Sequence, residues 1–231
     1  MGLGLGLNLS AGYTPGWEPS ELSSLLHWYR LGVGQTSDSG GITAWNDQKG
    51  SNNLTADGGA TEQPNLVNGT VFFNNNNDHL AFGTALELGK FSVYIRAQHE
   101  AANDFITSQA NSGGTDFLKI QNTIQARIKI NSARHDFNLN ITLSNDVKYT
   151  IGYERNADGV MGIFGEQDSN VINFSVAGAS PNDGIQAISD LTDFVEIGRP
   201  AVGLTIYEIV VLSDALDATN RALLIDYLSS K

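Results

Sequence analysis

Cysteine is absent from this sequence of 231 residues, so neither a disulfide framework nor thiolate chemistry is available to it. Charged residues make up only 16% of the chain, against roughly 25% in an ordinary soluble domain. Basic residues are the scarcer kind, since 13 Lys and Arg stand against 25 Asp and Glu, for a net charge of −12. Nucleic acids and anionic membranes both require a basic face on their partner. The composition therefore predicts no nucleic-acid partner and no membrane partner.

Long apolar runs are lacking as well. No segment approaches the roughly 18 apolar residues of a membrane-spanning helix. The N-terminus has neither the basic region nor the continuous apolar stretch of a secretory signal peptide. We therefore expect a protein that is made in the cytoplasm and is not exported by such a signal.

The chain is instead rich in turn residues, with 25 glycines and abundant asparagine, while 41% of its residues are hydrophobic. Both residue types tolerate a positive φ. Short runs of alternating apolar residues recur between these turns, which is typical of an all-β sandwich or barrel. The runs are Leu26–Leu31, Phe91–Ala97, Phe117–Gln121, Gln125–Ile130, Phe137–Ile141, Tyr149–Tyr153, Val160–Phe164, Val171–Val176 and Tyr207–Leu212.

The phase of the alternation predicts which side chains are buried. One apolar face is expected in the core: Phe91, Val93, Ile95, Phe137, Leu139, Ile141, Ile151, Ile209 and Val211. Asn156–Gly159 is expected to form a hairpin turn. Pro19–Leu26 is predicted to contain one helical turn, and Gly32–Gly41 a loop. A longer helix is predicted at Asp217–Leu228, because Asp217 is a good N-cap residue and apolar residues follow at helical spacing.

Residues 1–20 form a separate N-terminal arm, and residues 21–231 form one sandwich domain. The arm alternates glycine with leucine, so Leu3, Leu5, Leu7 and Leu9 should share one face of an extended segment. This face could dock on the body of its own chain or on a neighbouring subunit. The second alternative makes these leucines a partner-binding arm.

Several motifs, taken in chain order, resemble one family. They are Trp45–Leu54, Gln63-Pro64-Asn65, Val71-Phe72-Phe73-Asn74 with Asp78-His79-Leu80, Ile197-Gly198-Arg199, and Tyr207–Leu216 through Tyr227-Leu228. Together they resemble concanavalin A-like (laminin G-like) jelly-roll domains, of the kind found in tailed-phage virion proteins. The resemblance implies a jelly-roll sandwich of two antiparallel sheets with a short C-terminal helix. The chain departs from the pattern at Lys49, Asn74 and Asn220.

No catalytic constellation is evident. Glycosidases of this fold use paired carboxylates on one strand, and the nearest match, Glu166–Asp168, is better interpreted as exposed acids in a turn. The four histidines are isolated, so their spacing does not support zinc. Lectins of this superfamily often bind Ca²⁺ through loop oxygens, which makes Asp47 and Asp78 candidate calcium ligands. Ordinary turn chemistry accounts for the same two residues without a metal.

A sugar site would use an exposed aromatic side chain. Trp17 lies in the arm and is the candidate for stacking on a glycan, whereas Trp28 and Trp45 lie in or beside apolar strands and are expected in the core.

Three hypotheses follow. The first is a non-enzymatic virion protein, a capsid decoration or cement protein that forms a homo-oligomer and binds other virion proteins, either the major capsid protein or tail proteins. The second is a lectin-like, glycan-binding module of a tail fibre or spike. The third is a glycan hydrolase, which should release reducing sugar from polysaccharides. We predict that this protein is not an enzyme and has no cofactor other than the calcium considered above.

Overall fold

The structure is a computed structural model. It describes residues 16–75, 77–99, 103–107, 117–120, 124–130, 133–139, 144–167, 170–178, 191–198 and 203–231, with the backbone alone for 103–105, 107, 117, 120, 124–130, 133–139 and 170–178. The predicted arm leucines Leu3, Leu5, Leu7 and Leu9 therefore lie outside the described residues.

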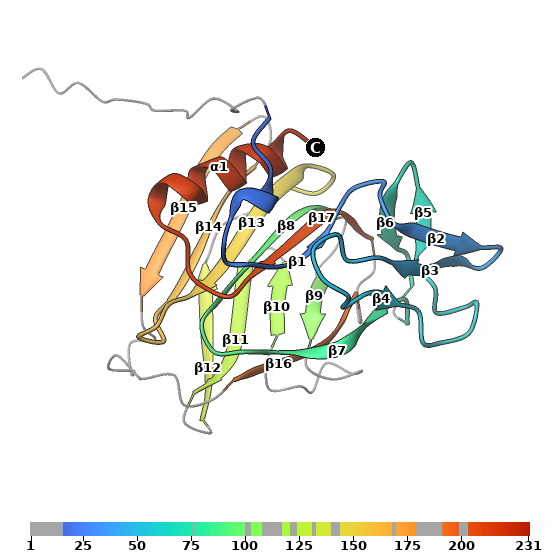
Figure 1. The fold of residues 1–231 in the computed structure, drawn as a ribbon, viewed down its shortest axis with the longest axis horizontal. Helices are drawn as coiled ribbons and strands as arrows, with labels where there is room; N and C mark the ends of the chain where they lie inside the picture. The colour runs from blue at the N-terminus through green and yellow to red at the C-terminus, as the bar shows by residue number, and fades with distance from the viewer. Residues whose placement is uncertain are drawn as a thin grey trace, which may run out of the picture.

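The described strands form two antiparallel sheets (Figure 1). One sheet contains β1 (Leu25–Tyr29), β5 (Asn65–Val67), β6 (Thr70–Phe73), β8 (Phe91–His99), β13 (Lys148–Arg155), β14 (Met161–Gln167), β15 (Asn170–Gly178) and β17 (Leu204–Leu212). The other contains β2 (Gln35–Asp38), β3 (Gly41–Trp45), β4 (Leu54–Thr55), β7 (Leu80–Leu88), β9 (Asn103–Thr107), β10 (Phe117–Ile120), β11 (Ile124–Ile130), β12 (Ala133–Leu139) and β16 (Thr192–Ile197). A 3-10 turn, η1 (Pro19–Glu21), precedes β1, and a helix, α1 (Ala218–Ser229), follows β17. Among the described residues, no helix is both long and apolar enough to cross a membrane.

The first sheet has the strand order β15-β14-β13-β8-β17-β6-β5, and the second has the order β12-β11-β10-β9-β16-β7-β4-β3-β2. Strand β17 is central to the first sheet, with β8 along one edge. Two short strands share its other edge: β6 pairs with Leu204–Ile206, and β1 pairs with the segment that begins at Ile209. Neither β6 nor β1 therefore pairs with β17 at Tyr207 and Glu208.

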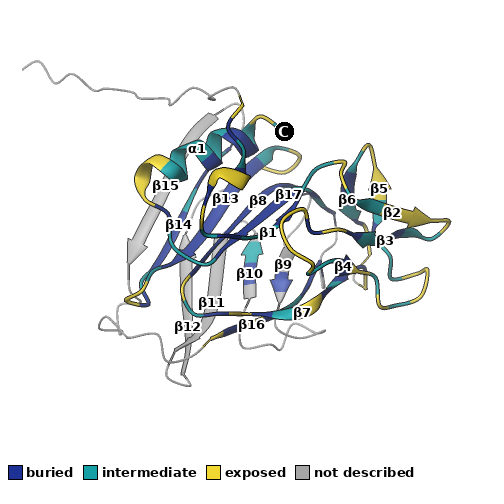
Figure 2. Cartoon of the chain, in the orientation of Figure 1, coloured by how far each residue is buried: buried dark blue, intermediate teal, exposed yellow. Residues whose placement is uncertain are grey.

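The space between the sheets holds the main core. Phe91, Val93, Ile95, Ile151, Ile209 and Val211 were predicted to lie there, and all six are 0% exposed. Strand alternation explains the pattern, because every second side chain of β8 points into the sandwich. Figure 2 shows β8, β13 and β17 buried along most of their length. The side chains of the other predicted core residues, Phe137, Leu139 and Ile141, lie outside the described ones.

A second apolar cluster lies on the outer face of the eight-stranded sheet, where α1 packs near β13 and β14 (Figure 1). It joins helix residues Leu224, Tyr227 and Leu228 to Trp28 and to outward-facing side chains of β8 and β17. The predicted N-cap is confirmed, since the carboxylate of Asp217 accepts the backbone N–H of Asn220 at 2.8 Å. The segment that precedes β1 packs on the same face through Trp17 and Leu22.

Some local predictions were wrong. Gly32–Gly41 was expected to be a loop, but Gln35–Asp38 forms β2 and pairs with β3. The strands β3, β4, β5, β7, β9 and β16 had no predicted counterpart. The turn at Asn156–Gly159 is confirmed: the Asn156 N–H donates to Val160 O at 3.1 Å, and Gly159 has a φ of 80°.

Candidate ligand-binding site

Aromatic side chains that reach the surface are few. Among the described side chains, every aromatic is buried except Phe72, Phe164 and Tyr207, which are partly exposed. The guanidinium of Arg221 covers the ring of Phe164, with its carbon 3.7 Å from the ring centroid. Phe72 and Tyr207 line one pocket, and they are therefore the aromatic groups best placed to meet a ligand.

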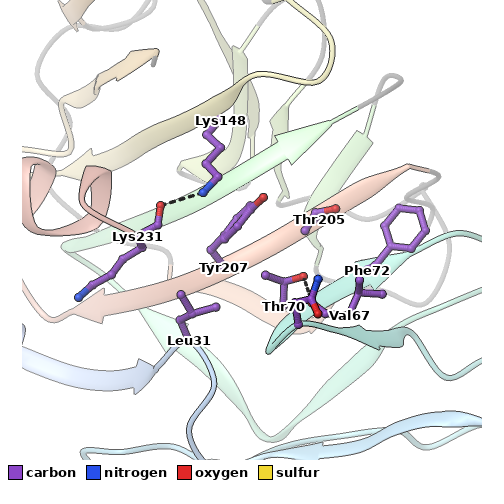
Figure 3. A pocket seen from close by; sticks show the side chains of 9 residues that line it. Leu31, Val67, Thr70, Phe72, Lys148, Thr205, Tyr207 and Lys231 are labelled. Carbon is purple, nitrogen blue, oxygen red and sulfur yellow. Dashed lines mark hydrogen bonds between the residues drawn. The ribbon is translucent and has the colours of Figure 1, made fainter. Parts of the chain in front are cut away.

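The pocket has a volume of about 530 Å³, within the range usual for small-molecule sites. It lies on the outer face of the eight-stranded sheet, beside the part that α1 covers. Figure 3 shows its nine lining residues as sticks: Leu31, Val67, Asn68, Thr70, Phe72, Lys148, Thr205, Tyr207 and Lys231. Aromatic, hydroxyl, amide and ammonium groups therefore converge on one hollow.

Strand geometry brings these side chains together. In β6, Val71 and Phe73 enter the core, so Thr70 and Phe72 point outward. Thr205 of β17 pairs with Phe72 in the ladder and shares its outward face. Along these two strands, residues that line the pocket thus alternate with residues that enter the core.

Tyr207 reaches the outer face because β17 contains a bulge. Ile206 pairs with Ala97 and Glu208 pairs with Arg96, so Tyr207 has no residue of β8 opposite it. Ile206 and Ile209 both enter the core, which leaves two consecutive residues facing outward. Without the extra residue, simple alternation would place Tyr207 in the core with Ile209.

A tight hairpin forms another wall. Val67 pairs with Thr70, and the two residues between them, Asn68 and Gly69, have φ values of 52° and 82°. Positive φ at both central residues defines a type I′ turn, for which Asn-Gly is the preferred sequence. The side chain of Gln35 donates from Nε2 to Gly69 O at 2.9 Å and holds this turn.

The polar groups of the pocket have defined partners. The Thr70 hydroxyl donates to Val67 O at 2.7 Å, and its oxygen can still accept a hydrogen bond. Lys148 Nζ donates to Lys231 O at 3.0 Å and lies 4.4 Å from the centroid of the Tyr207 ring. The Tyr207 hydroxyl donates to Gln98 Oε1 at 3.1 Å. These contacts fix the orientation of Tyr207 before any ligand is bound.

A smaller hollow of about 260 Å³ lies at the start of α1. Its carboxylate, Glu154, is 3% exposed and accepts hydrogen bonds from Tyr94 Oη at 2.5 Å and from two nitrogens of Arg221, Nε at 3.1 Å and a terminal nitrogen at 2.7 Å. Arg221 also donates to Leu216 O. This network joins the helix to the sheet, so its groups are already occupied by the fold.

The interpretation of Trp17 as the most exposed aromatic is wrong. Trp17 is 9% exposed, and its ring packs edge-on against Tyr227 with the centroids 6.0 Å apart. A tryptophan buried beneath the chain cannot stack on a glycan. The expectation that Trp28 and Trp45 lie in the core is confirmed, since they are 5% and 0% exposed.

The carboxylate of Asp47 joins its own loop to strand β1. It accepts hydrogen bonds from His27 Nδ1 at 2.8 Å and from the backbone N–H groups of Trp28 and Lys49 at 3.0 Å each. Burial raises the pKa of the carboxyl group, but these hydrogen bonds outweigh burial and lower the pKa to about 2. The occupied oxygens favour the turn interpretation over calcium at this position.

Asp78 is 2% exposed and accepts the backbone N–H groups of Asn74 and Asn75 at 2.9 and 3.1 Å. Burial raises its pKa, and the two hydrogen bonds oppose the change. Among the described residues, no three His, Cys, Asp or Glu side chains gather where they could hold a metal ion. Calcium binding stays a prediction.

Of the two acids in the Glu166–Asp168 segment, Asp168 lies outside the described residues. Burial is the main cause that raises the pKa of Asp226 in α1, and the negative charge of Glu166 raises it further. Glu166 lines neither of the pockets described above.

The sequence offered one missed signal for this site. Asn68-Gly69 between two apolar runs is a strong hairpin signature, and it would have placed Val67 and Thr70 side by side. Nothing in the sequence marks the bulge at Tyr207, because the run from Leu204 to Leu212 is almost continuously apolar.

No protein-family model matches this chain, and no curated protein matches it. Solved structures do. The sialidase of Trypanosoma rangeli in complex with sialic acid gives a TM-score of 0.57 at 10% identity, over 90% of this chain and 33% of that chain. The same sialidase in complex with 2,3-difluoro-KDN gives 0.57 at 11% identity, over 95% and 36%. The CBM40 domain of a Ruminococcus gnavus sialidase, bound to α2,3-sialyllactose, gives 0.45 at 14% identity, over 60% and 83%.

This chain thus spans about a third of the length of the Trypanosoma rangeli sialidase that it matches. At such low identity the likeness shows the fold alone. It confirms the β-sandwich of jelly-roll, concanavalin A-like type that the motifs predicted.

Proposed function

We propose that this protein is a non-catalytic carbohydrate-binding module, which binds a saccharide in the pocket lined by Tyr207 and Phe72. One observation carries the proposal. Two partly exposed aromatic rings, Phe72 and Tyr207, line the same pocket, together with the hydroxyl groups of Thr70 and Thr205, the amide of Asn68 and the ammonium of Lys148 beside the Tyr207 ring. A sugar presents both an apolar ring face and hydroxyl groups, so it matches this mixture.

The comparisons give weaker support, through the fold. The structures with the shared sandwich fold include sialidases, whose ligands are sugars. Most glycoside hydrolases place two carboxyl groups at the scissile bond, although sialidases use a tyrosine nucleophile, and the residues that line this pocket include no carboxyl side chain. We therefore favour binding without turnover.

The hypothesis of a capsid decoration protein rests on the jelly-roll resemblance, on the lack of a catalytic constellation and an export signal in the sequence, and on the N-terminal arm, whose leucines lie outside the described residues. No comparison supports a virion protein, so the hypothesis stays a prediction and the glycan-binding alternative takes precedence. A capsid or tail partner, homo-oligomerisation and localisation in a virion remain predictions with it.

The test is a glycan array followed by isothermal titration with the best saccharide. Tyr207→Ala should weaken binding about tenfold, because burying about 50 Å² of apolar surface contributes about 1.3 kcal/mol. Phe72→Ala should weaken binding by a similar factor, and Tyr207→Phe, which keeps the ring, should stay within about threefold of the parent.

Phe164→Ala is the matched control, because Phe164 is also a partly exposed phenylalanine but lies outside the pocket. It should leave the affinity unchanged. Binding that survives Tyr207→Ala together with Phe72→Ala would rule out this pocket. Release of reducing sugar from the bound saccharide would rule out the non-catalytic assignment.

A further inference from the structure

The charge of the pocket differs in sign from the charge of the chain. The chain carries a net charge of −12. The nine residues that line the pocket nevertheless include two lysines, Lys148 and Lys231, and no aspartate or glutamate. The net charge of the chain repels an anion, whereas the pocket offers it two ammonium groups.

Lys148 is the cation closest to the aromatic ring of the pocket. Its ammonium lies 4.4 Å from the centroid of the Tyr207 ring, whereas the ammonium of Lys231 lies over Tyr227, 4.1 Å from that centroid. Figure 3 shows Lys148 and Lys231 toward one end of the lining residues and Phe72 toward the other. Tyr207 lies between them, so one ring is adjacent to both a charged and an apolar part of the pocket.

The ammonium of Lys148 retains hydrogen-bonding capacity. It has three donors, and one is used by Lys231 O at 3.0 Å. Among the described residues, no side-chain carboxylate pairs with it. Other described basic residues do pair with a carboxylate: Arg30 with Glu18, Lys90 with Asp214 and Arg221 with Glu154. Two ammonium groups and no carboxyl side chain line the pocket, so it keeps a positive charge beside an aromatic ring although Lys148 already donates to Lys231 O. Such a site is suited to a ligand that supplies a carboxylate.

We propose that the pocket selects saccharides that carry a carboxylate, with the sugar ring stacked against Tyr207 and the carboxylate bound by the ammonium of Lys148. This inference rests on the proposed function and adds the class of ligand to it. A single ammonium beside the ring matches the single charge of a sugar carboxylate. Uronic acids and sialic acids both carry this group.

The test compares each acidic sugar with its own uncharged form. The probes are a galacturonic acid trisaccharide and 3′-sialyllactose, each with its methyl ester, and titrations are run in 50 mM NaCl. At least one acid should bind about tenfold more tightly than its ester. The acid that shows the preference identifies which of the two sources supplies the carboxylate. Raising NaCl to 500 mM should reduce the preference, because salt screens an exposed charge pair.

Lys148→Met should remove the preference, so that in this variant the acid and its ester bind with affinities within about twofold of each other. Lys148→Arg keeps the charge and should restore the preference. Lys90→Met is the matched control, because Lys90 is an exposed lysine paired with Asp214 outside the pocket; it should leave the preference unchanged. Thermal melts of each variant show that the fold is retained.

The outcomes separate the inference from the function beneath it. If acid and ester bind equally and Tyr207→Ala weakens both, the pocket binds saccharides but the inference is wrong. A preference that persists in Lys148→Met, or that appears only for a sulfated sugar added to the panel, also overturns it. If no saccharide on the array binds at all, the proposed function fails and the inference fails with it.

Discussion

Glu208 gives the sharpest test of how the outer layer is held on the sheet. Its carboxylate is 0% exposed. It accepts hydrogen bonds from Trp28 Nε1 at 2.6 Å, Tyr227 Oη at 2.8 Å and the Leu31 backbone N–H at 3.3 Å. One side chain of β17 thus contacts both β1 and α1, and its replacement should loosen both.

Glu208→Ala should lower the free energy of unfolding by about 2–4 kcal/mol. The change leaves the indole N–H of Trp28 and the hydroxyl of Tyr227 buried without their acceptor, at about 1–3 kcal/mol each. The variant also no longer bears the cost of burying a carboxylate, and this gain offsets part of the loss. Glu208→Gln keeps the volume and one acceptor oxygen for both donors, so it should cost less than about 1 kcal/mol.

Urea denaturation at pH 7, followed by tryptophan fluorescence and circular dichroism, measures both variants. Trp28→Phe removes one donor together with its need for an acceptor, so Glu208→Ala should cost less in that background than in the parent. The reasoning is refuted if Glu208→Ala and Glu208→Gln differ by less than about 0.5 kcal/mol.

The pH dependence provides a second measurement on the same residue. Burial raises the pKa of Glu208 above its ordinary value of 4.5, although the hydrogen bonds from Trp28 and Tyr227 oppose the change. The folded chain therefore holds this proton more tightly than the unfolded chain. The contribution to stability is full below 4.5 and is lost as the pH rises through the folded-state pKa. The difference in stability between the parent and Glu208→Gln should show this fall, and a difference that is independent of pH would contradict it.

Three further predictions concern single residues. Burial lowers the pKa of His99 below 6.5, so stability should fall as the pH drops from 6.5 to the lowered value, and thermal melts at pH 5 and 7 should show a smaller fall in His99→Phe. Asp47→Ala should cost about 2–3 kcal/mol in urea denaturation, because buried N–H donors lose their acceptor; EDTA should leave the melting temperature of the parent unchanged, and a clear decrease would support calcium. A Cβ at Gly152 would collide with the ring of Tyr94, so Gly152→Ala should cost about 2 kcal/mol or more, whereas Gly59→Ala, which meets nothing within 4 Å, should stay within about 0.5 kcal/mol by the same measurement.

The strands at the centre of the sandwich could be predicted from the sequence. In β8, Phe91, Val93 and Ile95 alternate with residues of the other face, and burial on one face imposes a period of two. Strands at the margins were harder to predict. β2 is Gln35–Asp38, exposed at three of its four positions, and its pairing with β3 depends on the fold rather than on local hydrophobicity.

The candidate site was missed for a different reason. Alternation counted back from Ile209 assigns Tyr207 to the core, yet the bulge between Ile206 and Glu208 reverses its direction. A bulge depends on how two strands register, and an apolar run carries no mark of it. The prediction for Trp17 was wrong in the opposite direction, because the side chain was expected to be exposed and is buried. Its burial depends on Tyr227, more than two hundred positions along the chain.

The bulge also explains why the pocket and the helix anchor are neighbours. Tyr207 and Glu208 both face outward, where neither β6 nor β1 pairs with β17. Glu208 binds the outer layer, and that layer supplies walls of the pocket.

Two of those walls can be traced to the outer layer directly. Glu208 accepts the backbone N–H of Leu31, which lines the pocket. Lys231 follows α1 and accepts the ammonium of Lys148 through its main-chain oxygen. The ring of Tyr207 is thus bounded by groups whose positions depend on how α1 and β1 dock. A variant that weakens this docking should therefore lose ligand affinity before it loses the sandwich, because the core between the sheets does not include the residues that hold the outer layer.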